Sequence, residues 1–344
     1  MDRELERRDI IINAIITVYL ETGEPVGSGY IASCCGLGIS SATVRNVLKE
    51  LEENGYLYQP HVSSGRIPTL KCYRYYVKHI MPFPVLDEPE RLKIKRLVET
   101  ALREKDVDLF MAHVAEVLSE VTDLIGVTMA PFFEKCIFEK IEIVHLASSR
   151  YMIIVSLGSG IIKTINITLD KVIPRAEIEA TARVLSNMLH GLMVSEVKST
   201  LGNRIELLRG TGRLLFDVIL DNSDIIFGSD DEKGLHLSGL SRILSMPDFA
   251  GPEYSMKLAG LFEHKKQIAD VVSQAVIAED DIKIDIGLGG MLDYRPSLSM
   301  ISAKYRTGQS HGVVAVLGPT RIQYPKLMAI LRYTAEVASG FFSS

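Results

Sequence analysis

Residues 21–76 read ETGEPVGSGYIASCCGLGISSATVRNVLKELEENGYLYQPHVSSGRIPTLKCYRYY, and they decide the fold of the N-terminal part of the chain. The pattern predicts a short helix from Ser28, a glycine-rich turn, and a longer helix from Ser40 or Ser41 to Asn54. Serine is favoured at helix starts, and an Asn-Gly pair is favoured at helix ends. A small hairpin follows. This order of parts is that of a winged helix-turn-helix, which places one helix in a DNA major groove with the hairpin beside it.

The longer helix has two distinct faces. Apolar side chains at helical spacing predict the face that packs inward, namely Val44, Val47, Leu48 and Leu51. The opposite face carries Ala42, Arg45, Asn46 and Lys49. Arginine can read guanine and asparagine can read adenine, so this face is suited to base edges. An ordinary solvated face is the alternative, but the turn before the helix and the hairpin after it favour DNA.

The segment after this helix is basic. No Asp or Glu occurs between Asn54 and Leu86, whereas Arg66, Lys71, Arg74 and Lys78 do. We expect Gly65 to supply a positive backbone angle at the hairpin tip. We expect Arg66 to enter a minor groove or contact a phosphate, the alternative being a surface turn with one exposed arginine. The predicted DNA-binding residues are Ser28, Ser41, Ala42, Thr43, Arg45, Asn46, Lys49, His61, Ser63, Ser64, Arg66, Lys71 and Arg74.

Composition indicates a soluble protein of several domains. The chain has 344 residues, 47% of them hydrophobic and 24% charged, with a net charge of -5. Its four cysteines form no C-x-x-C pair, so no metal site or disulfide framework is expected, and the protein fits a reducing cytoplasm. The charged N-terminus is not a signal peptide. The uncharged apolar-rich run from Tyr151 to Ile162 is shorter than the about 20 residues that span a membrane.

The rest of the chain predicts an α+β fold. The run Met81-Pro82-Phe83-Pro84 breaks a helix, so we place a first domain at residues 1–82. Strands are expected at residues 138–146, 151–157, 161–169, 282–286, 298–305 and 312–317. Helices are expected at residues 175–190 and 324–341, with a mostly helical region over 194–279. We therefore expect a sheet domain at 83–194 and 281–344, with a connecting helix at 88–125, interrupted by an inserted, mainly helical segment at 195–280.

Several motifs resemble one family. They are ETGEPVGS (21–28), SATVRNVLKELEENGYLYQPH (41–61), SSGRIPT (63–69), YRYYV (73–77), HLSGLSRILSMPDF (236–249) and VLGPTRIQY (316–324). Together they resemble the heat-inducible transcription repressor family, HrcA, over nearly the whole chain.

This resemblance implies an N-terminal winged helix, a GAF-like sheet domain and an inserted dimerising segment. It also implies a homodimer that represses chaperone operons by binding double-stranded DNA at an inverted repeat, and a DNA-binding form that depends on the chaperonin GroEL. We therefore expect a heat-coupled switch: when unfolded proteins occupy the chaperonin, less repressor stays active. The segment Glu253 to Ala278 is a candidate dimer interface through Leu258, Leu261, Phe262, Ile268 and Val272, the alternative being an ordinary core helix.

Two other functions are weighed against repression. An enzyme is not expected, because the chain has no P-loop, H-E-x-x-H or G-x-S-x-G, and neither Gly158-x-Gly160 nor Gly287-x-Gly289 has the third glycine of a dinucleotide site. No cofactor or metal is expected. The remaining alternative is a small-molecule-responsive transcription regulator with a ligand pocket in the GAF-like domain, since such domains often bind small molecules.

Overall fold

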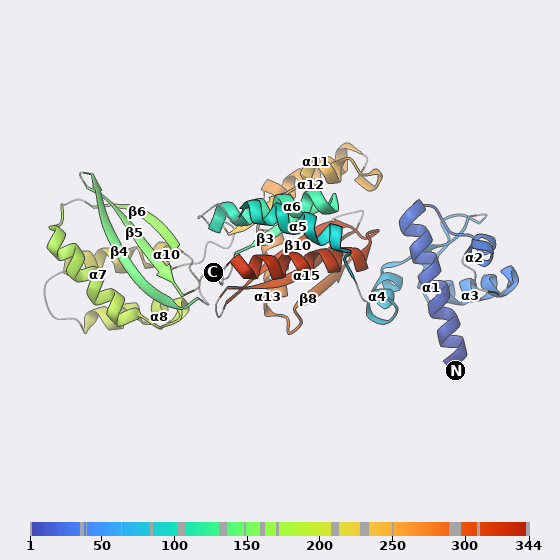
Figure 1. Ribbon diagram of the computed structural model, residues 1–344, viewed down its shortest axis with the longest axis horizontal. Coiled ribbons are helices and arrows are strands. Elements are labelled where there is room, and N and C mark those ends of the chain that lie inside the picture. The colour runs from blue at the N-terminus through green and yellow to red at the C-terminus, as the bar shows by residue number, and fades with distance from the viewer. Residues whose placement is uncertain are drawn as a thin grey trace.

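The computed structural model has a mixed α+β fold with antiparallel sheets, arranged as three units in a row (Figure 1). A helical N-terminal unit lies at one end, a five-stranded sheet lies in the middle, and a three-stranded sheet lies at the other end. The structure describes residues 2–34, 38, 40–62, 64–82, 85–101, 107–130, 136–147, 149–158, 162–169, 172–207, 213–227, 234–249, 251–263, 265–288, 297–307 and 310–341.

In its described residues, the N-terminal unit contains four helices and a short antiparallel hairpin. Its elements are α1 (Asp2–Thr22), α2 (Ser28–Cys34), α3 (Ser41–Glu53), β1 (Leu57–Tyr58), β2 (Ile67–Pro68) and α4 (Leu70–His79). A stripe of isoleucines on α1, including Ile11 and Ile15, is fully buried and shares one core with α3 and α4. Helix α1 stops at Gly23, whose φ of 72° lies in the left-handed region that glycine favours.

The central sheet has the strand order β7-β3-β10-β9-β8, and every neighbouring pair is antiparallel. The strands are β7 (Leu235–Ser238), β3 (Ile125–Met129), β10 (Ser310–Pro319), β9 (Leu298–Thr307) and β8 (Ile282–Ile286). Side chains alternate along β10, so that Val314 and Val316 face one core and Val313 and Ala315 face another.

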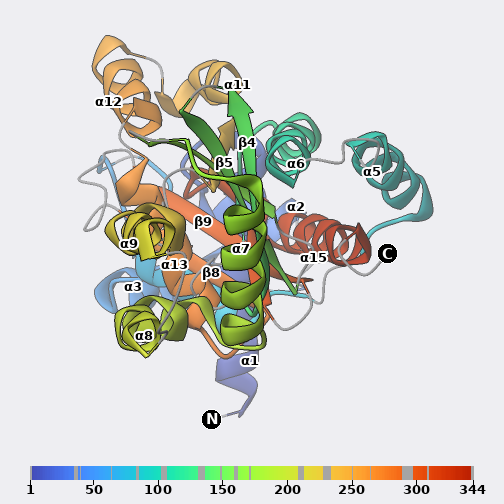
Figure 2. The same cartoon turned by 90° about the vertical axis from the view of Figure 1, so that its left-hand side faces the viewer.

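Both faces of the central sheet are therefore covered (Figure 2). On one face lie α5 (Glu88–Ala101), α6 (Val107–Thr122) and α15 (Tyr324–Phe341). On the other lie α11 (Leu240–Leu244), the 3-10 turn η2 (Pro247–Phe249), α12 (Pro252–Glu263) and α13 (Lys266–Ile277).

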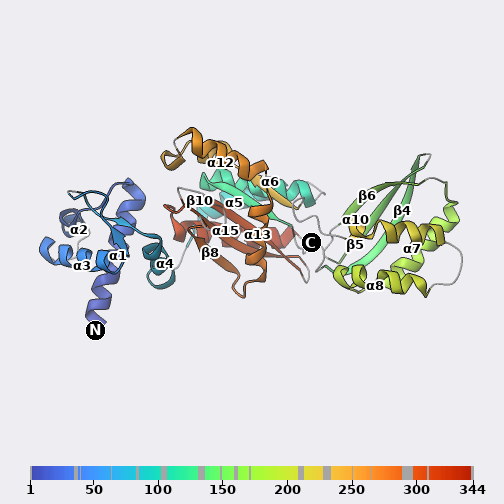
Figure 3. The same cartoon turned by 180° about the vertical axis from the view of Figure 1, so that it is seen from behind.

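The third unit is built on β4 (Phe138–Ala147), β5 (Arg150–Leu157) and β6 (Ile162–Thr168). Helices α7 (Arg175–Leu189), α8 (Val194–Glu206), α9 (Arg213–Asp221) and α10 (Ser223–Phe227) follow in the chain. Side chains of these helices share one core with the strands, and the helices pack on one face of the sheet (Figure 3). Strands and helices of this unit thus lie close to the ranges expected from the sequence. The single connecting helix expected at 88–125 is instead two helices, α5 and α6, which pack on each other.

The division of the chain differs from the expected boundaries. Residues 136–227 form one core with the three-stranded sheet, whereas residues 235–277 pack on the central sheet. The expected insertion at 195–280 therefore cuts through both units. The periodicity of the sequence predicted most of the strands but not which strands pair. It missed β3 and β7, two strands of the central sheet that are distant from each other in sequence and pair with each other.

Helices α12 and α13 consequently have a different environment from the one expected of a dimer interface. Leu258, Leu261, Ile268 and Val272 are buried in the monomer, in the core beneath the central sheet. The alternative reading of this segment, an ordinary core helix, fits their burial.

Candidate nucleic-acid interface

Helix α3 is fixed at both ends by its own sequence. The Ser40 side chain accepts a hydrogen bond from the Thr43 N–H at 3.2 Å and caps the start of the helix. Asn54 caps the end, and Gly55 leaves the helix with a φ of 74°. The bounds predicted for this helix are therefore confirmed, with Ser40 as the cap.

The two faces of α3 separate as predicted. Val44, Leu48 and Leu51 are buried, and Val47 is half-buried. Ala42, Arg45, Asn46 and Lys49 are all exposed. Lys49 forms an exposed ion pair with Glu53 at 3.6 Å. Arg45 and Asn46 have no side-chain partner among the described residues, so both are available to a ligand.

Small hydroxyl side chains gather at the start of α3. The Ser28 and Ser41 hydroxyls lie 3.4 Å apart, joining the start of α2 to the start of α3. Thr43 lies half-buried two residues after Ser41. The first backbone N–H groups of a helix carry partial positive charge, so this corner is suited to a phosphate.

The hairpin tip is a braced turn. Ser64 donates its hydroxyl hydrogen to the His61 carbonyl at 2.7 Å and accepts from the His61 N–H at 3.0 Å. The Gln59 amide donates to the carbonyls of Val62 and Ser64. Val62 is 100% exposed. His61 and Ser64 thus lie at an exposed, ordered tip, and the predicted contact Ser63 lies outside the described residues.

Gly65 is required for a reason other than the one expected. The φ angle of Gly65 is not positive, so the hairpin tip does not need the left-handed backbone conformation at this residue. A Cβ at this position would lie 2.5 Å from the Pro25 carbonyl oxygen and from the Val26 carbonyl carbon. The hairpin thus approaches the backbone before α2 so closely that only glycine fits.

Arg66 does not extend freely from the tip. Its Nη2 and Nε lie 2.8 and 3.0 Å from Glu52 Oε2, and its side chain is only 16% exposed. Its backbone N–H and carbonyl pair with the carbonyl and N–H of Val26, each at 2.9 Å. Because α3 supplies this carboxylate, Arg66 ties the hairpin to α3 and α2, and the minor-groove role expected of it does not fit this arrangement.

Lys71 and Arg74 are also engaged within the protein. Lys71 Nζ donates to the Asn54 carbonyl at 2.7 Å and lies 4.5 Å from the centre of the Tyr56 ring. Arg74 Nη2 donates to the Ile286 carbonyl, in the central sheet, at 2.8 Å. Lys71, Arg74 and Lys78 nevertheless remain exposed on α4, so the basic segment is on the surface although two of these three cations have partners within the protein. The exposed face of α3 remains the main candidate surface.

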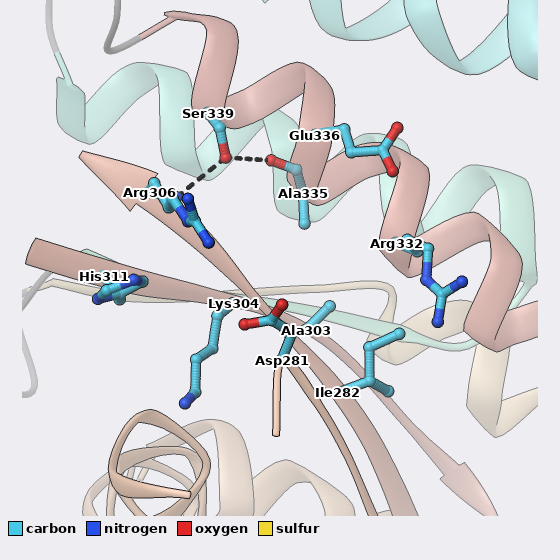
Figure 4. A pocket seen from close by; sticks show the side chains of 10 residues that line it. All are labelled: Asp281, Ile282, Ala303, Lys304, Arg306, His311, Arg332, Ala335, Glu336 and Ser339. Carbon is cyan, nitrogen blue, oxygen red and sulfur yellow. Dashed lines mark hydrogen bonds between the residues drawn. The ribbon is translucent and has the colours of Figure 1, made fainter. Parts of the chain in front are cut away.

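A second feature lies in the central unit, where a hollow of about 470 Å³ opens between β9, β10 and α15 (Figure 4). Its lining includes the basic side chains of Lys304, Arg306, His311 and Arg332 and the acidic ones of Asp281 and Glu336. Burial, together with the charges of Lys304 and Arg306, lowers the pKa of His311. This hollow could not be predicted from the sequence, because its residues come from separate segments.

The described ranges contain no group of three His, Cys, Asp or Glu side chains placed to hold a metal ion. Within the same ranges, every helix is too short or too polar to cross a membrane.

Comparison with known proteins identifies relatives over the whole chain. Residues 108–328 match the family described as HrcA protein C terminal domain. A protein of Chlorobium chlorochromatii called heat-inducible transcription repressor HrcA is 35% identical over 99% of this chain and 98% of its own. Its namesake from Geobacter sulfurreducens is 34% identical over 97% of each chain. A crystal structure of a hypothetical protein has the same fold, with a TM-score of 0.59 at 22% identity over 98% of each chain. This chain therefore belongs to the HrcA family of heat-inducible transcription repressors.

Proposed function

We propose that this protein represses chaperone operons by binding an inverted-repeat operator as a homodimer, with α3 as the recognition helix of a winged helix-turn-helix. The observation that carries the proposal is the exposed face of α3, where Arg45 and Asn46 have no side-chain partner among the described residues. In the major groove these side chains would read base edges. The hairpin tip at His61 and Ser64 would lie along the adjacent backbone.

A homodimer follows from the symmetry of an inverted repeat, which needs one recognition helix for each half-site. We propose that the unit at residues 136–227 supplies the dimer contact. Its helices pack on one face of the three-stranded sheet. The other face carries the apolar side chains of Val144, Met152, Ile154 and Ile162, of which Val144 is 43% and Ile162 61% exposed. A second copy on this face would remove that apolar surface from water.

We further propose, from the family to which the chain belongs, that the chaperonin GroEL maintains the DNA-binding form. The central unit would then be the GAF-like domain. The protein would lose its DNA-competent conformation on heating and recover it through the chaperonin, so that repression would track free chaperonin.

The test of operator binding starts from sequence selection with purified protein on a random duplex library. An inverted repeat is expected, with preference over a scrambled duplex by a factor of about 10³ or more. The chaperonin is tested separately, by heating and cooling the protein with and without GroEL and ATP. Enrichment of no sequence would overturn the operator proposal. Full binding after heating without chaperonin would overturn the chaperonin proposal alone.

The hollow beside α15 favours a second candidate function, a regulator that responds to a small molecule. Its mixture of basic and acidic side chains would suit a ligand carrying both charges. A panel of metabolites in a thermal-shift assay tests it. A metabolite that raises the melting temperature, with an effect abolished by Arg332→Ala, would support this function, and a flat panel would count against it.

A further inference from the structure

Arg321 joins two units of the protein. Its Nη2 lies 2.9 Å from Asp248 Oδ2, and its Nη1 donates to the Leu20 carbonyl at 3.4 Å. Leu20 lies in the last turn of α1, where backbone carbonyls have no partner within the helix, so the guanidinium caps that end. The hydrogen bond that Arg321 donates to the Asp248 carboxylate raises the pKa of Arg321, which therefore stays charged under all ordinary conditions.

The backbone after α1 makes room for this contact. Gly23 turns the chain with a φ of 72°, and a Cβ there would lie 3.1 Å from Arg321 Nη1. Three segments far apart in the sequence thus meet at one point: the end of α1, the turn η2 with Asp248, and the segment before α15 with Arg321.

A second contact between the same units lies on α4. Arg74 reaches the Ile286 carbonyl, and Leu70 packs so closely on Gly287 that a Cβ there would lie 2.7 Å from the leucine Cδ1. The rings of Tyr73 and Tyr324 lie 5.9 Å apart. Attachment at both α1 and α4 restrains rotation of the N-terminal unit about either contact.

The orientation of α3 follows from that of α1. Val44 and Leu48 of α3 belong to the same core as Ile11 and Ile15 of α1, and the two helices are in contact, so a shift of α1 is passed on to α3. A residue that holds the end of α1 on the central unit thus also sets the direction in which the exposed face of α3 points.

We propose that Arg321 is a positioning residue for DNA binding, which holds the N-terminal unit at a fixed angle to the central unit through Leu20 and Asp248. The inference rests on the proposed dimeric operator binding. In a two-fold dimer this angle sets the distance and the rotation between the two recognition helices, so it sets the half-site spacing that the protein accepts. Arg321 would thus determine which spacing between half-sites the protein accepts, and not which bases it prefers within a half-site.

The test compares the wild-type dimer with Arg321→Ala and Asp248→Asn on duplexes that carry the selected inverted repeat with altered spacers. Arg242→Ala is the matched control, because Arg242 pairs with Asp123, so that both partners belong to the central unit. Inserting about five base pairs turns one half-site half a turn around the duplex. Wild type and Arg242→Ala should lose about a hundredfold in affinity, since both half-sites can no longer be bound at once.

Arg321→Ala should lose less than about tenfold, because a loosened N-terminal unit can follow the displaced half-site. Asp248→Asn should fall between the two. Binding to a duplex with a single half-site should stay within about twofold of wild type for every variant, as neither residue touches DNA. Thermal melting confirms that each variant is folded at the assay temperature.

Wild-type sensitivity to the spacer in Arg321→Ala would overturn the positioning role. Weakened binding to the single half-site, with spacer dependence kept, would also overturn it, since the residue would then act on the fold of the unit itself. If the wild-type protein selected no inverted repeat, the proposed operator binding itself would be overturned. That result distinguishes failure of operator binding from failure of the positioning role of Arg321.

Discussion

Arg45 lies on the exposed face of α3 with no side-chain partner among the described residues, so its removal costs the folded protein little. Arg45→Ala should weaken specific binding by about 1–3 kcal/mol and relax the preference at one base position, with an unchanged melting temperature. Fluorescence anisotropy on the selected duplex and on single-base variants measures this. Lys49→Ala is the control on the same helix, since a phosphate contact weakens binding evenly across sequences. Equal loss on every duplex for both variants would remove Arg45 from base reading.

Arg66, unlike Arg45, is largely buried and paired with Glu52, so its replacement should lower the stability of the folded protein. Arg66→Ala leaves Glu52, itself 31% exposed, without its partner. The free energy of unfolding should fall by about 1 kcal/mol, a modest value because the pair is partly solvated. Urea unfolding of Arg66→Ala, Glu52→Ala and the double variant isolates the coupling between the two side chains. A coupling of zero, with DNA affinity lost on all sequences, would indicate that Arg66 leaves Glu52 and contacts the DNA backbone.

Tyr73 and Tyr324 are neighbouring buried tyrosines with different hydrogen bonding. The Tyr73 hydroxyl has no partner among the described residues, whereas the Tyr324 hydroxyl donates to the Thr320 carbonyl at 2.8 Å. Burial raises the pKa of both phenols. Tyr73→Phe should raise the free energy of unfolding by about 1 kcal/mol, and Tyr324→Phe should lower it by a similar amount. Equal effects of the two substitutions in chemical denaturation would contradict this assignment.

At the scale of elements, the hairpin depends on how closely it can approach the segment before α2. Gly65→Ala places a methyl group against the backbone of Pro25 and Val26, so the bridge between Val26 and Arg66 must open. We expect a loss of about 1–3 kcal/mol in unfolding free energy. Gly29→Ala is the matched control, because Gly29 lies in α2 with open space around it and alanine favours a helix. The control should be neutral or stabilising in the same thermal melts.

Helix α3 could be predicted from the sequence because its determinants are local. The cap at Ser40, the stop at Gly55 and the apolar spacing of Val44 and Leu48 all lie within a few turns of one another. Glu52 is also close in sequence to Arg66, but only the folded hairpin brings the two together. The run of basic residues in the sequence therefore did not reveal that Arg66 is held by Glu52.

The short strand β3 could not be predicted from the sequence, because its determinants are not local. All five residues of β3, Ile125–Met129, are buried, and such a run has no alternation that separates it from the preceding helix. Gly126 in this strand leaves no room for a Cβ, which would lie 2.0 Å from the Ala115 carbonyl oxygen of α6. The close approach of Gly126 to α6 results from tertiary packing, so it could not be predicted from the residue pattern of the strand.

At the scale of the whole molecule, the three units are joined in different ways. The N-terminal unit and the central unit share one continuous core that runs from Ile11 in α1 to Leu331 in α15. The unit at residues 136–227 has a core of its own. The molecule therefore separates the N-terminal and central units, which share a core, from a third unit whose outer sheet face carries exposed apolar side chains.

This separation leads to a prediction on assembly. Ile162→Glu places a charge at the start of β6, on the outer face of the three-stranded sheet, where Ile162 is 61% exposed and its burial is not needed for folding of the monomer. The dimer should dissociate to monomers in sedimentation equilibrium, and affinity for the inverted repeat should fall by about a hundredfold as the second half-site is lost. Leu207→Glu is the control, since Leu207 is 82% exposed on the same unit but follows α8, on the helical side. If both variants stayed dimeric, the dimer contact would lie elsewhere. If both became monomers, exposed apolar surface in general, and not the sheet face, would hold the two copies together.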